Sequence, residues 1–146
     1  MFKSILILLA TLAASHNTYA DTFKSEEELV IFTNKVMTEM SKGNIGTALL
    51  YLKPYVILPE SDFQSSLEGT KSQRELYASR LGKDVGYECF KPKKLGLSLV
   101  RQACIEKTEK GAIAWQFLFY KSPTGWNINS YSWSTDAIPS LFMLDQ

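Results

Sequence analysis

The spacing of apolar residues is helical in the first half of the chain and alternating in the second half. Ser25-Glu26-Glu27-Glu28 predicts the start of a helix, because the motif forms a capping box. In this motif the Ser25 side chain accepts a hydrogen bond from the third backbone amide of the helix, and the Glu28 side chain reaches back to the backbone N–H of the cap. Gly43 favours the left-handed conformation that ends such a helix. The predicted apolar face consists of Leu29, Val30, Phe32, Thr33, Val36, Met37 and Met40.

Two more segments before Gly82 have helical character. A shorter helix is predicted over about residues 44–53, with Pro54 ending it. Residues 59–81 are polar and tolerate a helix, with Gly69 as a candidate break. The candidate buried positions in this last segment are Phe63, Leu67, Leu76, Tyr77 and Leu81.

After Gly82 the apolar residues alternate, which predicts strands. Residues 85–90 and 97–103 predict two antiparallel strands around a turn near residues 92–96. Residues 112–121 and 126–133 predict a hairpin around Ser122-Pro123-Thr124-Gly125. Helices followed by long antiparallel strands are typical of an α+β domain, in which the N-terminal helices pack on a strongly curved sheet.

The second hairpin has a definite predicted register. Pairing Lys121 with Trp126 places Phe119 opposite Ile128, Phe117 opposite Ser130 and Trp115 opposite Ser132. One face then holds Trp115, Phe117, Phe119, Trp126 and Ile128. The other, more polar face holds Gln116, Leu118, Tyr120, Asn127, Asn129, Tyr131 and Trp133.

Residues 1–20 predict a secretory signal peptide. Lys3 precedes an apolar run over residues 5–14, and small residues follow up to Ala20. The run of about ten residues is too short for a helix that crosses a hydrocarbon core of about 30 Å. Thr18-Tyr19-Ala20 suits signal peptidase, so we place the cleavage after Ala20. We expect residues 21–146 to form a single periplasmic or secreted domain, soluble and without membrane insertion.

The predicted cleavage changes the charge and the available chemistry. Loss of Lys3 leaves 15 basic and 15 acidic side chains, and this neutral balance argues against nucleic acid as a partner. Cleavage also removes His16, the only histidine. Ser-His-Asp and Cys-His catalysis and histidine-containing zinc sites are therefore excluded. The sequence contains no metal-ligand spacing or phosphate loop, so we predict neither a metal nor a cofactor.

Cys89 and Cys104 are the only cysteines, with 14 residues between them. In an oxidising compartment a disulfide is favoured, worth roughly 3 kcal/mol for a loop of this size, and two buried thiols are the alternative. A turn centred between Gly96 and Leu97 aligns the two cysteines. A turn at residues 94–95 instead places Glu88 opposite Arg101, so the two pairings compete.

The sequence also resembles a known superfamily. Residues 115–133 (WQFLFYKSPTGWNINSYSW), Arg80-Leu81-Gly82 and residues 95–101 (LGLSLVR) resemble small secreted bacterial proteins of the nuclear transport factor 2-like superfamily, also called ketosteroid isomerase-like or cystatin-like. The resemblance covers about residues 25–136, and its motifs determine the fold rather than catalysis. It implies a cone-shaped pocket between the sheet and the helices, and homodimers are common among such folds.

Few residues in the chain suit the chemistry of that superfamily. Its enzymes place a carboxylate and a tyrosine or second acid inside an apolar cone. The candidate catalytic carboxylates are Glu88 and Asp136, and Glu106 is the other acid well inside a predicted strand. The alternative to catalysis for Glu88 is an ion pair with Arg101. For Asp136 the alternative is a cap on the last strand or on a closing turn at residues 138–142. The candidate ligand-binding residues are Tyr87, Arg101, Trp115, Tyr120 and Tyr131, for which packing in the core is the alternative.

Three functions follow from these observations. The first is a non-enzymatic periplasmic or secreted module that binds a small apolar ligand or an envelope protein. The second is an isomerase, dehydratase or hydrolase that uses Glu88 or Asp136 as the base and a tyrosine as the donor. The third is a homodimeric structural partner in the cell envelope, with an apolar patch on the convex face of the sheet. The scarcity of catalytic groups favours the first.

Overall fold

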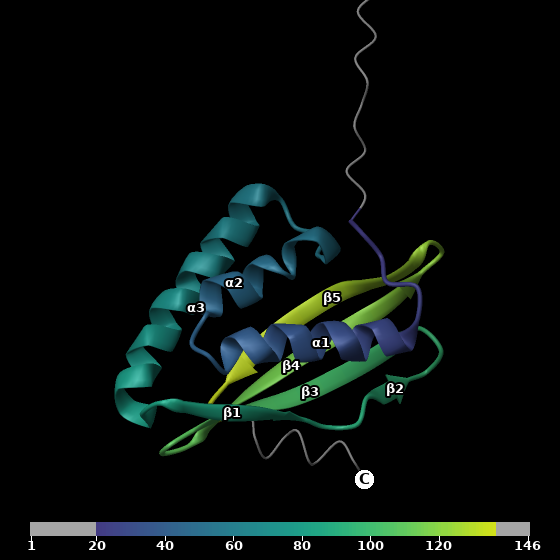
Figure 1. Ribbon diagram of the computed structural model, residues 1–146. Helices are drawn as coiled ribbons and strands as arrows, with labels where there is room; N and C mark the ends of the chain where they lie inside the picture. Colours follow the sequence, from purple (N-terminus) through teal and green to yellow (C-terminus); the bar gives the residue numbers. More distant parts are fainter. Residues whose placement is uncertain (1–19, 137–146) are drawn as a thin grey trace, which may run out of the picture.

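The computed structural model describes residues 20–136 (Figure 1). Helices precede strands and lie against one face of a twisted antiparallel sheet, which confirms the predicted α+β class. The predicted signal peptide, apart from Ala20, and the predicted turn at residues 138–142 lie outside the described residues. The elements are α1 (Glu26–Met40), α2 (Ile45–Leu50), the 3₁₀ helix η1 (Lys53–Tyr55), α3 (Glu60–Leu81), β1 (Asp84–Cys89), β2 (Lys93–Leu95), β3 (Leu99–Thr108), β4 (Ala112–Ser122) and β5 (Gly125–Ser134).

The first helix, α1, begins and ends close to where its sequence predicts. Ser25 is the N-cap, and its hydroxyl accepts from the backbone N–H of Glu28 at 3.3 Å. The Glu28 carboxylate accepts from the N–H of Lys24 at 2.7 Å, one residue before the cap. Gly43 adopts a φ of 78° after the helix, as predicted for the stop. The buried residues of α1 are Leu29, Phe32, Thr33, Val36, Met37 and Met40.

The long helix α3 differs from its prediction in two respects. It continues through Gly69, which therefore does not break it. Leu76 is 66% exposed, so its predicted burial is wrong. The reason is geometric, because Leu76 lies off the stripe that α3 turns toward the molecule at three- and four-residue steps. That stripe consists of Phe63, Leu67, Thr70, Arg74, Tyr77 and Leu81, all buried or partly buried.

The sheet has the strand order β1-β3-β4-β5, and β2 pairs with the end of β3 beyond β1. Two segments from the helical half bridge the free edge of β5, through Phe23 with Trp126 and Val56 with Ile128. The space between helices and sheet is filled by side chains rather than open. Its buried aromatic residues include Phe23, Phe32, Phe63, Trp115, Phe117, Phe119 and Trp126.

The predicted β4–β5 register is confirmed next to the turn and wrong further along. Lys121 lies opposite Trp126 and Phe119 lies opposite Ile128, as predicted. Beyond these pairs the register shifts by one residue. Phe117 is therefore opposite Tyr131 instead of Ser130, and Trp115 is opposite Trp133 instead of Ser132.

The cause of the shift is a β-bulge at Asn129, which has no partner because Ile128 and Ser130 pair with consecutive residues of β4. An extra residue reverses the face of every side chain that follows it. Tyr131 and Trp133 consequently lie on the face that meets the helices, where both pack against the main core. The prediction had placed them on the opposite face.

Between the two competing registers for the cysteines, the structure selects the one that aligns them. Cys89 on β1 lies opposite Cys104 on β3, and the two form a disulfide. In the same β1–β3 register Glu88 lies opposite Ile105, while Arg101 pairs with Lys93 of the separate strand β2. The alternative cross-strand pair of Glu88 with Arg101 is therefore wrong.

Candidate functional site

A charged cluster lies inside the layer between α3 and the sheet. Glu106 of β3 is fully buried and accepts hydrogen bonds from the Arg74 guanidinium on α3 and from Nε1 of Trp115 on β4, the latter at 3.0 Å. The same Arg74 nitrogen donates to Asp84 of β1 at 3.2 Å. Burial raises the pKa of Glu106, and the neighbouring guanidinium opposes that rise. The cluster ties α3 to three strands, and each Glu106 oxygen already has a donor.

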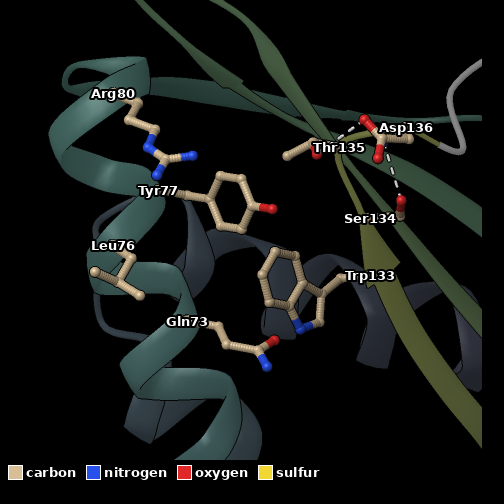
Figure 2. Close-up of a pocket in the computed structure, with 8 residues that line it drawn as sticks. All are labelled: Gln73, Leu76, Tyr77, Arg80, Trp133, Ser134, Thr135 and Asp136. Carbon is tan, nitrogen blue, oxygen red and sulfur yellow. Dashed lines mark hydrogen bonds between the residues drawn. The ribbon is translucent and has the colours of Figure 1, made fainter.

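Beside this cluster, a pocket of about 420 Å³ opens between α3 and the end of β5 (Figure 2). Figure 2 shows one wall on the helix and the other on the strand and the residues that follow it. The helical wall consists of Gln73, Leu76, Tyr77 and Arg80, and the strand wall consists of Trp133, Ser134, Thr135 and Asp136.

Two aromatic rings, one from each wall of this pocket, are in contact with each other. Tyr77 and Trp133 meet edge to face, with ring centroids 5.6 Å apart and planes at 89°. Behind them Trp133 stacks on the buried ring of Trp115, with centroids 6.1 Å apart, and Trp115 donates to Glu106. The strand wall is thus supported by the same charged cluster that holds α3, which fixes the width of the pocket.

The rim of the pocket has one positive and one negative side chain. The Arg80 guanidinium lies over the Tyr77 ring, 6.0 Å from its centroid, and forms no salt bridge with a described residue. Asp136 is exposed on the opposite wall, where it accepts from the Thr135 hydroxyl at 3.3 Å. Its backbone N–H donates to the Ser134 hydroxyl at 3.0 Å. The arrangement suits a flat ligand with an anionic group toward Arg80.

The two predicted catalytic carboxylates lie far apart in the fold. Asp136 lines the pocket between α3 and β5, near the Tyr77 ring that the sequence had assigned only to the core. Glu88 is exposed on β1, on the sheet face that turns away from the helices. Of the two carboxylates, only Asp136 lines the pocket that contains Tyr77 and Trp133.

Three of the predicted ligand-binding residues, Tyr87, Trp115 and Arg101, do not line the pocket between α3 and β5. The Tyr87 hydroxyl donates to Asn34 Oδ1 at 3.2 Å and lies 3.3 Å from the Thr38 hydroxyl, which joins β1 to α1. Trp115 is fully buried behind Trp133. Arg101 is 8% exposed, on the sheet face away from the helices.

Tyr120 and Tyr131 are brought together at a second pocket, of about 660 Å³. This pocket lies between β5 and residues 56–58, and Ser66 of α3 also lines it. The hydroxyls of Ser66 and Tyr131 are hydrogen-bonded at 3.0 Å. It shares no lining residue with the first pocket.

The sequence prediction missed several residues of the first pocket and its support. Arg74 and Arg80 belong to a helix that reads as uniformly polar, and Trp133 was assigned to the wrong face because no sequence pattern marked the bulge at Asn129. The sequence does contain one signal that Arg74 has a structural role. It occupies a position of the buried stripe of α3, and a cation there predicts a buried acidic partner.

No protein-family model, curated protein or solved structure matches this chain. Within residues 20–136, no helix is long and apolar enough to cross a membrane. The same residues contain no group of three or more histidine, cysteine or acidic side chains that would hold a metal ion.

Proposed function

We propose that this protein is a non-enzymatic periplasmic or secreted binding module of the nuclear transport factor 2-like type. Its ligand is a small molecule with a flat apolar body and a carboxylate, packed against the Tyr77 and Trp133 rings that line the pocket. The observation that carries the proposal is the edge-to-face pair of rings that lines a pocket of about 420 Å³, with the Arg80 guanidinium over one of them. The two rings supply apolar surface and Arg80 supplies a charged group, a combination found in small-molecule sites.

The burial of Glu106 and the hydrogen bonds to both of its oxygens support binding rather than catalysis. A general base needs a carboxylate within reach of a proton on the substrate. Glu106 has no exposed surface, and its two oxygens accept from Arg74 and Trp115. The interior that a catalytic cone would leave open is filled by aromatic side chains such as Phe117 and Phe119.

Two features support the proposed location. The disulfide between Cys89 and Cys104 is typical of proteins in oxidising compartments. The residues just after the proposed cleavage site are part of the fold, since Asp21 donates its N–H to the Pro54 carbonyl at 2.7 Å and Phe23 pairs with Trp126. Helices packed on one face of an antiparallel sheet also agree with the proposed superfamily.

A titration with 3-phenylpropionate, followed by NMR, tests this proposal. We expect shifts at Tyr77, Arg80 and Trp133, and weaker binding as salt is raised, because the guanidinium lies at an exposed rim. Arg80→Gln should weaken binding about fivefold, by the energy of a solvent-exposed charge pair of about 1 kcal/mol.

Two controls sharpen the measurement. The neutral amide 3-phenylpropanamide should bind wild type and Arg80→Gln equally, because it lacks the charge. Lys83→Gln removes an exposed charge just beyond α3 that does not line the pocket, and it should leave binding of the carboxylate unchanged. Absence of shifts around Tyr77 and Trp133, or equal binding of the carboxylate by wild type and Arg80→Gln, would refute the proposal.

A further inference from the structure

The second pocket, lined by Tyr120 and Tyr131, has a chemical character unlike that of the first. Its volume is about 660 Å³, and its lining contains no aspartate, glutamate, lysine or arginine. A pocket without charged groups does not select a ligand by its charge. The polar groups that line it lose their water when a ligand enters, so a ligand must replace those hydrogen bonds. Its selectivity therefore comes from hydrogen bonds and shape.

The hydrogen-bonding groups of this pocket are amides and hydroxyls. Asn127 and Asn129 contribute two side-chain amides, and neither makes a hydrogen bond with a described residue. Each amide offers two donors and one acceptor oxygen. Ser66 and Tyr131 add hydroxyls that bond each other at 3.0 Å and retain further donor or acceptor capacity. Side-chain amides and hydroxyls that can donate and accept therefore line this pocket.

The bulge at Asn129 contributes to this arrangement. It places Asn129 between Ile128 and Ser130 as an unpaired residue, and all three residues line the pocket. Regular alternation would send neighbouring side chains to opposite faces, whereas a bulge locally redirects them. Bulges are often found next to binding sites for this reason.

The apolar part of the pocket is an exposed aromatic ring and a short loop. Tyr120 is 41% exposed, and Ile57 in the loop of residues 56–58 is 74% exposed. The Tyr120 ring presents a flat apolar surface beside the amides, and Ile57 adds an aliphatic one. Sugars have this combination of properties, because one face of a pyranose ring consists of C–H groups and its edge consists of hydroxyls that donate and accept.

We propose that this second pocket binds a neutral sugar of one or two residues, with the ring stacked on Tyr120 and the hydroxyls bonded to Asn127 and Asn129. The site is independent of the carboxylate pocket between α3 and β5. Because no charged residue lines it, its affinity does not change with salt.

NMR titration with three neutral disaccharides, cellobiose, maltose and N,N′-diacetylchitobiose, tests this site. We expect at least one of them to shift the side-chain amide signals of Asn127 and Asn129, equally at low and high salt. Signals of Tyr77 and Trp133 should not move. Shifts at Asn127 and Asn129 with none of the three sugars, or with 3-phenylpropionate alone, would overturn the proposal.

Two exposed substitutions test the named contacts. Tyr120→Ala and Asn129→Ala should each weaken binding of the sugar about threefold to tenfold, which corresponds to the loss of one stacking contact or one hydrogen bond. Ser132→Ala is the matched control, because Ser132 is exposed on the same strand and does not line the pocket. Equal affinity in wild type and both pocket variants would overturn the proposal. Unchanged 3-phenylpropionate titrations show that the variants are folded and separate this site from the first.

Discussion

At the scale of single residues, the buried contact between Arg74 and Glu106 makes the fold sensitive to the loss of one partner. Both side chains are almost fully buried, and removal of one partner leaves the other as an uncompensated charge. Arg74→Met should therefore lower the free energy of unfolding at neutral pH by about 3 to 5 kcal/mol. Chemical denaturation monitored by tryptophan fluorescence measures this loss.

The direction of the Glu106 pKa makes that loss depend on pH. Burial raises the pKa of Glu106 in the folded state above its ordinary value of 4.5, and removal of Arg74 raises it further. A raised carboxyl pKa favours the folded state below the unfolded value, and this advantage is lost as pH rises through the folded value. The cost of Arg74→Met should thus be small below pH 4.5 and largest at neutral pH.

The double variant Arg74→Met/Glu106→Gln provides the control for this prediction. Glutamine keeps an acceptor for Nε1 of Trp115 but has no charge that requires a partner. The double variant should recover much of the stability that Arg74→Met loses at neutral pH. Its stability relative to wild type should also change less with pH than that of Arg74→Met. An equal loss for Arg74→Met at acidic and neutral pH would contradict the role given to Glu106.

At the scale of secondary-structure elements, local patterns determined the helices and the turn of the second hairpin. The capping box at Ser25 and the glycine stop at Gly43 depend on nearby residues alone, and both appear as predicted. The bulge at Asn129 has no such local pattern. The bulge turns Tyr131 and Trp133 toward α3, where they contact Ser66 and Tyr77, and sequence spacing does not contain this information.

The disulfide gives a prediction at the same scale. It joins β1 to β3 and closes a loop with 14 residues between the cysteines, so it restricts the unfolded chain. Cys89→Ala/Cys104→Ala should lower the free energy of unfolding by roughly 3 kcal/mol. Wild type treated with dithiothreitol should lose a similar amount, and the reductant should not affect the double variant. Equal stability of oxidised and reduced wild type would contradict this assignment.

At the scale of the whole molecule, the fold class was predictable and the sites were not. The change from helical spacing to alternation near Gly82 was enough to predict helices packed on an antiparallel sheet. The first pocket instead depends on which residues of α3 meet the end of β5. Tyr77 and Trp133 are 56 positions apart in the sequence, and their meeting depends on the bulge and on the buried charged cluster.

The proposed export of the protein leads to a prediction about the whole chain. Asp21 and Phe23 are held by Pro54 and Trp126, so the residues directly after the proposed cleavage site are part of the fold. Mass spectrometry of protein expressed in a bacterial host and recovered from its periplasm should give a chain that starts at Asp21, with Cys89 and Cys104 oxidised. A version without residues 2–20, expressed in the cytoplasm, should contain both thiols reduced until it is exposed to an oxidant. Recovery of the uncleaved chain from the cytoplasm, with its thiols reduced, would contradict export. It would also remove the oxidising environment on which the disulfide depends.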